Sequence, residues 1–214
     1  MPPKKSPAKA KEPAAQEAKK EVRKQTALQK NYLIAYNLAS CIGWFAVLVL
    51  VVQELQTAGY QSVYGKVSTL LNIVQTCALF EVSNLNSVWF ILAKYDYPEV
   101  RQSYFVSSMV IAWSITEIVR YGYYALNLIY GKAPLFSTYI RYTFFFVLYP
   151  LGAGSEFMLI QYAIPFAQQT QAFYGFVFTF IAGMYAPGFW FMYQHMIKQR
   201  SKVFEKVFGK DKNE

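Results

Sequence analysis

The chain has 214 residues, of which 55% are hydrophobic, 19% aromatic and only 15% charged. A soluble domain carries about 25% charged residues, so this composition excludes an ordinary soluble enzyme and indicates a protein that lies in lipid. The net charge of +9 would fit nucleic-acid binding, but its location argues against that function. Residues 1–30 carry a net charge of +6 and residues 198–214 carry +3, whereas the charges of the residues between them sum to zero.

The two ends of the chain read as basic tails. Residues 1–30 are rich in Lys, Ala, Pro and Glu, and such a segment buries too little apolar surface to fold. We therefore predict a disordered tail at 1–30 and a second basic tail at 198–214, both cytosolic by the positive-inside rule. The lysines third and fifth from the end, Lys210 and Lys212, resemble the dilysine retrieval signal of endoplasmic-reticulum membrane proteins.

Between the tails, residues 31–197 form one predicted membrane domain. It contains five apolar stretches, at 32–52, 67–93, 104–130, 139–166 and 172–194. Each reaches the roughly 20 residues that a membrane-spanning helix needs. The prediction is an all-α, multi-pass transmembrane helix bundle with five apparent spans.

Five spans conflict with two cytosolic tails, because two ends on one side of a membrane require an even number. Counting from either end places the conflict between about Lys66 and Arg101. Since 67–93 is too short for two full spans, either it forms a re-entrant or interfacial element or the chain lacks one helix.

Charged groups inside a bilayer are costly and are functional candidates by default. Glu117 and Arg120 lie three residues apart on the third stretch, a spacing that suits a local ion pair. Two interpretations stay open, a structural pair or an Arg120 that meets an anionic ligand.

The fourth stretch holds the strongest candidates for chemistry. Tyr149 and Glu156 are seven residues apart, which places them on one helix face about 10 Å apart along the axis. Pro150 is expected to bend the helix between them. Gly152 and Ser155 are small enough to allow close helix approach or a ligand chain. A carboxyl group and a phenol in one polar slot form a plausible acid–base pair, and the alternative is that both residues serve packing.

Several runs of residues resemble the 3-hydroxyacyl-CoA dehydratase family of very-long-chain fatty acid elongation, over about residues 33–205. These runs are Trp113–Tyr121, Arg141-Tyr142, Leu148–Gly152, Ser155-Glu156, Tyr185–Phe189 and His195–Arg200.

The resemblance implies a lyase of the endoplasmic-reticulum membrane that dehydrates 3-hydroxyacyl-CoA to trans-2-enoyl-CoA. It implies Tyr149 and Glu156 as catalytic residues, with Arg141, Gly152 and Ser155 supporting activity or structure. Glu156 is the slightly preferred base on intrinsic acidity, and the reverse assignment stays open. The phosphates of CoA are expected near Arg141 and Arg120, with Lys132 or Lys198 as further candidates.

Partners, cofactors and alternative functions complete the expectations. The resemblance implies the lipid bilayer and the other elongation enzymes, a ketoacyl-CoA synthase, a ketoreductase and an enoyl reductase, as partners. No cofactor or metal is expected, because water elimination needs none. The main alternative is a non-catalytic membrane scaffold of the elongation complex, and a transporter is a weaker one.

The family's older name, protein-tyrosine-phosphatase-like, points to a different chemistry. That chemistry needs a cysteine followed six residues later by an arginine. Here Val47 stands six residues after Cys41, and Ser83 six residues after Cys77, so a phosphatase is excluded.

One departure from the family is large. Its members have six spans, and this chain is shorter than the pattern by about one helix between Glu81 and Trp113. The absent part includes the family's third span and its Ser-Arg motif. The resemblance therefore implies loss of a helix beside the active site, at the place where the span count fails.

Overall fold

The computed structural model describes residues 27–78 and 97–209 of the chain, and the regular structure there is entirely helical. The helices are α2 (Ala27–Thr57), α3 (Val63–Ala78), α5 (Pro98–Arg101), α6 (Tyr104–Tyr130), α7 (Leu135–Thr143), α8 (Phe145–Thr170) and α9 (Ala172–Phe208). The predicted all-α membrane-type fold is confirmed. The two lysines of the predicted retrieval signal, Lys210 and Lys212, lie outside the described residues.

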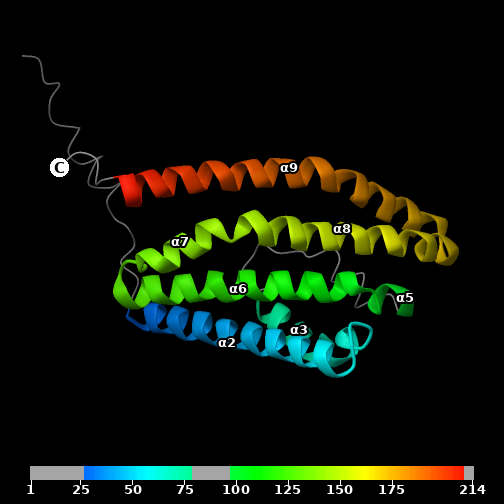
Figure 1. Cartoon of the computed structure of the whole chain (residues 1–214), viewed down its shortest axis with the longest axis horizontal. Helices are drawn as coiled ribbons and strands as arrows, with labels where there is room; N and C mark the ends of the chain where they lie inside the picture. Colours follow the sequence, from blue (N-terminus) through cyan, green and yellow to red (C-terminus); the bar gives the residue numbers. More distant parts are fainter. Residues whose placement is uncertain (1–26, 79–96, 210–214) are drawn as a thin grey trace, which may run out of the picture.

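Four long helices of the described chain form the bundle. Helices α2, α6, α8 and α9 lie side by side in that order, and α3 packs against α2 and α6 (Figure 1). The core between α2, α6 and α8 is apolar, with Trp44, Val47, Met109, Tyr121 and Leu159 almost completely buried. Many other large apolar side chains are exposed, including Phe136, Phe176 and Phe191 at 67% or more, as expected of residues that face lipid.

Helix α6 begins and ends where the sequence predicts, at 104 and 130. The Ser103 side chain accepts a hydrogen bond from the backbone N–H of Phe105 at the start, which satisfies an N–H that the helix leaves free. Gly131 ends the helix with φ at 72°, a left-handed conformation that glycine adopts at little cost.

The fourth predicted stretch, 139–166, is divided. Helix α7 ends at Thr143 and α8 begins at Phe145, with Phe144 between them. Pro150 lies inside α8, which is helical from Tyr149 through Glu156. The helix is interrupted at Phe144, six residues before Pro150. A proline disturbs the helical turn that precedes it, because its ring meets the carbonyl of the fourth residue back.

Three helical segments of the described chain are long and apolar enough to cross a membrane. They are Ala27–Thr57, Leu135–Thr170 and Ala172–Val207. Helix α6 is long enough to cross a membrane, but Glu117, Arg120 and its tyrosines and serines make it less apolar than these three segments. For that reason it is not among them. Of the predicted stretch 67–93, α3 covers the part up to Ala78, and the rest lies outside the described residues.

The two ends of the described chain lie at the same end of the bundle (Figure 1). The chain reaches the opposite end of the bundle at the turn after α2. Helix α6 begins at that same end, since the Tyr60 ring packs edge-on against the Tyr104 ring with ring centroids 6.4 Å apart. There also the hydroxyl groups of Tyr97 and Thr170 are 3.2 Å apart. The end of α2 and the start of α6 therefore lie at one end of the bundle, and the four long helices of the described chain run in alternating directions.

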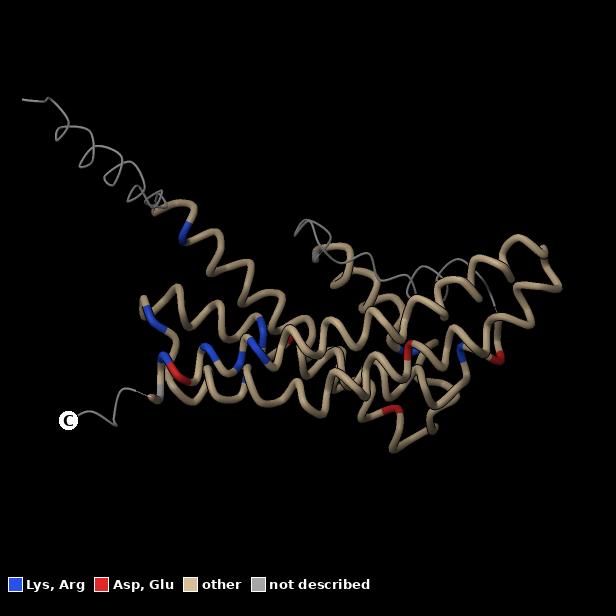
Figure 2. The backbone as a smooth tube through the Cα atoms, turned by 90° about the horizontal axis from the view of Figure 1, so that it is seen from above, with Lys and Arg blue, Asp and Glu red and all other residues tan. Residues whose placement is uncertain are grey.

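Basic residues gather toward the end that holds both chain ends (Figure 2). They lie at the start of α2, in the α6–α7 connection, on α7 and in the last turns of α9, and they are Lys30, Lys132, Arg141, Lys198, Arg200, Lys202 and Lys206. The opposite end carries Lys66 and Arg101 together with Glu54 and Glu99. The charge asymmetry inferred from the tails therefore continues into the folded domain.

Candidate active site

A cavity of about 1000 Å³ lies among the helices, lined by α6, α7, α8 and α9 together with Trp44 of α2 and part of α3. Along α9 its lining extends from Phe180 to Gln199, which at 1.5 Å per residue is about 28 Å. Most of the wall is apolar. Such a long apolar cavity with a few polar groups fits a ligand with an extended hydrocarbon chain.

Six of the seven predicted site residues line this cavity. They are Glu117, Arg120, Arg141, Tyr149, Gly152 and Glu156. Neither Cys41 nor Cys77 is among the residues that line it. Lys132 and Lys198 do not line it either.

Tyr149 and Glu156 both face the cavity from α8, as their spacing predicts. The Tyr149 ring stacks on Phe189 of α9, with centroids 5.2 Å apart and an interplanar angle of 18°. Tyr193 stacks on the same ring at 6.2 Å. The aromatic contacts fix the plane of the Tyr149 ring, so its hydroxyl has a defined direction.

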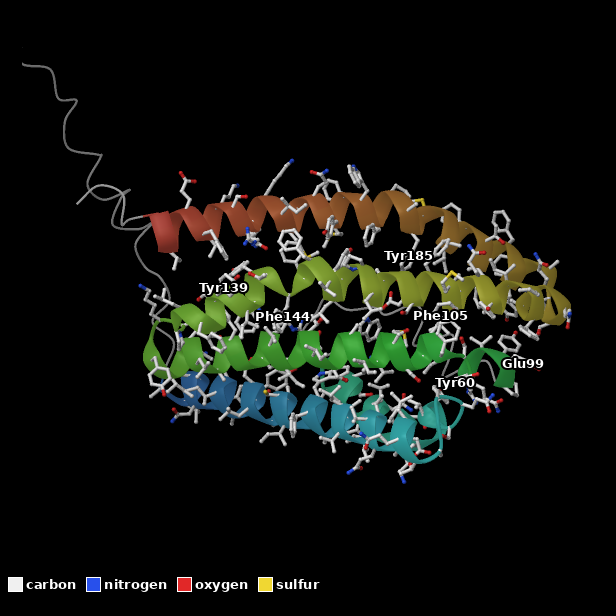
Figure 3. The ribbon with its side chains drawn as sticks, in the orientation of Figure 1. Tyr60, Glu99, Phe105, Tyr139, Phe144 and Tyr185 are labelled. Atoms are coloured by element: carbon white, nitrogen blue, oxygen red, sulfur yellow. The ribbon has the colours of Figure 1, made fainter. Side chains whose placement is uncertain are left out.

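Glu156 is held by a residue from the facing helix. The hydroxyl of Tyr185 on α9 donates a hydrogen bond to Oε2 of Glu156. Tyr185 is labelled in Figure 3, on the side of α9 that faces α8. The Tyr185 ring also packs against Phe157, with centroids 6.2 Å apart. The carboxyl group is therefore anchored through one oxygen at the interface between α8 and α9.

Gly152 allows α8 to approach α6 closely. A β-carbon at this position would stand 3.2 Å from Cδ1 and 3.3 Å from Nε1 of Trp113. Ser155 is buried, and its hydroxyl lies 2.7 Å from that of Ser108 on α6 and donates to the carbonyl of Leu151. Gly152 and Ser155 together hold α8 on α6, and Ser155 points away from the cavity.

The two arginines of the cavity have different surroundings. Arg120 forms an ion pair of 2.7 Å with Glu117 and also donates to the Tyr121 hydroxyl. Arg141 on α7 donates to the Tyr124 hydroxyl at 3.0 Å, and its guanidinium lies 4.7 Å from the ring centroids of both Tyr123 and Tyr124. Within the described residues no carboxylate forms an ion pair with Arg141, so its charge is available to an anionic ligand.

Sequence reasoning missed Tyr185 as a site residue. It stands in the run Tyr185–Phe189 that carries part of the family resemblance, but 29 residues separate it from Glu156. No helical spacing relates two residues on different helices, so only the packing of α8 against α9 brings them together. Among the described residues no three His, Cys, Asp or Glu side chains gather in a way that could hold a metal ion.

Comparisons with known proteins agree with the geometry. The family model of the protein tyrosine phosphatase-like protein, PTPLA, matches residues 67–206. The very-long-chain (3R)-3-hydroxyacyl-CoA dehydratase PASTICCINO 2 of Arabidopsis thaliana is 32% identical over 212 residues, covering 84% of this chain and 95% of that protein. A probable very-long-chain (3R)-3-hydroxyacyl-CoA dehydratase of Schizosaccharomyces pombe is 35% identical, covering 84% and 96%. The human very-long-chain (3R)-3-hydroxyacyl-CoA dehydratase 2 is 33% identical, covering 80% of each chain.

The alignment lengths bear on the predicted shortening. Since 84% of 214 residues is about 180, the 212 aligned positions with the Arabidopsis protein include about 30 that have no counterpart here. That is the size of one membrane-spanning helix with its connection. No solved structure matches the chain. The matches over most of its length confirm the resemblance, and the chain belongs to the protein tyrosine phosphatase-like family, which includes the very-long-chain 3-hydroxyacyl-CoA dehydratases.

Proposed function

We propose that this protein is a very-long-chain (3R)-3-hydroxyacyl-CoA dehydratase, a hydro-lyase that releases water to give trans-2-enoyl-CoA. One observation carries the proposal most directly. Tyr149 and Glu156, the residues expected to act as an acid–base pair, face the same long apolar cavity from one helix. The names of the relatives support the same activity.

The reaction needs a base and an acid on one substrate. The thioester carbonyl acidifies the C2 hydrogen, and a base removes it as a proton. The electron pair then forms the C2–C3 double bond while the C3–O bond breaks, and an acid gives the departing hydroxyl a proton so that it leaves as water. Positioned groups of this kind typically contribute 10²–10⁴-fold each.

Glu156 suits the role of base and Tyr149 that of acid. A carboxylate accepts a proton readily, whereas a phenol begins with one to give. The Tyr185 hydroxyl donates to Oε2 of Glu156, which matches a carboxylate acceptor. The stacked position of Tyr149 against Phe189 directs its hydroxyl independently of Glu156.

Different parts of the cavity suit different parts of the substrate. Arg141 lies on α7, at the end of the bundle where both ends of the described chain lie, and its guanidinium suits the phosphates of CoA. The apolar wall formed by Phe180, Ile181 and Met184 suits the acyl chain. The reacting carbons then lie between the two, beside Tyr149 and Glu156.

The cellular setting follows as part of the proposal. Both ends of the described chain lie at the basic end of the bundle, which supports two cytosolic tails by the positive-inside rule. We place the protein in the endoplasmic-reticulum membrane, with Lys210 and Lys212 as retrieval signal. There it would act in fatty acid elongation beside a ketoacyl-CoA synthase, a ketoreductase and an enoyl reductase.

The direct test uses membranes that contain the protein and a long-chain 3-hydroxyacyl-CoA. Tyr149→Phe and Glu156→Gln each abolish formation of the enoyl-CoA while the amount of protein stays the same. Tyr162→Phe and Glu205→Gln are matched controls, because both residues are exposed and outside the cavity, and both retain activity. Near-normal turnover by either cavity variant would reject the assignment, and rescue of a dehydratase-deficient cell by the double variant would favour a scaffold.

A further inference from the structure

Tyr185 contacts Glu156 but belongs to a different helix and is not one of the pair that performs the elimination. We infer that Tyr185 is a positioning residue that holds the Glu156 carboxylate in the orientation the reaction needs. The inference rests on the proposed dehydratase function and deepens it. It adds a third residue to the site, with a role distinct from acid and base.

The contact joins two helices that pack against each other. Tyr185 lies on α9 and Glu156 on α8, and both line the cavity. Within the described part of the chain, no Lys or Arg forms an ion pair with Glu156. Arg120 is paired with Glu117 and Arg141 bonds to Tyr124. The Tyr185 hydroxyl is thus the polar group that fixes this carboxylate.

The arrangement makes the two carboxylate oxygens unequal. Oε2 accepts the hydrogen bond from Tyr185, whereas Oε1 has no partner among the residues that the structure describes. A carboxylate held through one oxygen presents the other in a single direction. Productive proton transfer requires the base within about 0.5 Å of its working position, which rotation about the side-chain bonds of an unanchored glutamate would not maintain.

The Tyr185 ring is itself fixed in place. It packs against Phe157, the residue that follows Glu156 on α8. Because the ring contact and the hydroxyl contact are separate, Tyr185→Phe removes the hydrogen bond and keeps the packing. The substitution therefore isolates the positioning role from the structural one.

Steady-state kinetics in membranes test the inference. Tyr185→Phe is expected to lower kcat by roughly 10- to 100-fold, the effect of one lost hydrogen bond to a charged group, with KM for the 3-hydroxyacyl-CoA unchanged. The amount of protein and its Tm in detergent stay at the wild-type value. Tyr162→Phe, which removes a hydroxyl from an exposed tyrosine of α8, leaves both constants unchanged. An unchanged kcat for Tyr185→Phe, or a change confined to KM, overturns the inference.

A double-mutant cycle gives an independent readout. Glu156→Asp shortens the side chain and withdraws the carboxylate from Tyr185, so adding Tyr185→Phe to it should cause little further loss of kcat. Losses that multiply would show that the two residues act separately and would overturn the positioning role.

The same membranes distinguish this inference from the proposed function. An inactive wild-type protein overturns both. An active wild type with an inactive Glu156→Gln variant and a fully active Tyr185→Phe variant overturns the positioning role alone.

Discussion

Gly152 of α8 lies against Trp113 of α6 so closely that a β-carbon at position 152 would stand 3.2 Å from the indole ring. The neighbouring Gly154 is on the same helix, and a β-carbon there would meet nothing within 4 Å. Two glycines two residues apart thus have opposite environments, which makes them a matched pair for testing how α8 packs.

Gly152→Val is expected to destabilise the protein by about 1–3 kcal/mol, the usual effect of overpacking a tight contact. It would also displace α8, which carries Tyr149 and Glu156, and lower turnover. Gly154→Ala should raise stability by up to about 1 kcal/mol, because alanine favours a helix over glycine. Thermal unfolding in detergent measures both. Equal tolerance of the two substitutions would contradict the close contact with Trp113.

Glu117 and Arg120 are expected to behave as a unit. Their side chains are 18% and 23% exposed and form an ion pair of 2.7 Å. Removing one partner leaves a charge uncompensated in a mostly buried place, which costs a few kcal/mol, whereas Glu117→Gln combined with Arg120→Gln removes both charges. The double variant should therefore be more stable than either single variant, as measured by Tm and by yield from membranes. A double variant as unstable as the sum of the singles would mean that each residue has a separate role.

Arg141 is expected to bind the phosphates of the substrate. Arg141→Ala should raise KM for the 3-hydroxyacyl-CoA by about 10-fold or more, the value of one charge-assisted hydrogen bond. Its effect should be much smaller on a 3-hydroxyacyl thioester that lacks the phosphates. Arg141→Lys should be intermediate, since lysine keeps the charge but loses the planar fork.

The control for Arg141 is Lys198→Ala, which removes a basic residue that is exposed and outside the cavity. It should leave KM unchanged. An equal loss with both thioesters would place Arg141 in support of the fold, through Tyr123 and Tyr124, instead of in substrate binding.

Apolar runs in the sequence predict where the long helices lie, but they do not predict every helix end. The apolar stretch 104–130 coincides with α6, and the structure shows that Ser103 and Gly131 cap its two ends. Helix α9 continues to Phe208, beyond the apolar stretch that ends at 194. Its last turns are stabilised by contacts with distant residues, such as the Phe204 ring against Tyr139, and a hydropathy pattern does not contain such contacts.

The candidate site was predictable where one helix supplies it. Tyr149 and Glu156 face one cavity because seven residues complete two helical turns. The role of Ser155 was harder to anticipate, since its hydroxyl bonds to Ser108 across a helix interface. Tyr185 required knowledge of which helix faces α8. Spacing within a helix is local information, and pairing between helices is not.

A single residue, Gln171, separates α8 from α9. Tyr149, Glu156 and Tyr185 therefore belong to one helical hairpin made by the last third of the chain, and their mutual placement depends on neighbours that are synthesised together. Helix α3, which precedes the region where the family resemblance predicts a missing helix, packs mainly on α2 and α6. The contacts within the hairpin do not involve that region, so the three side chains can reach their mutual placement without it.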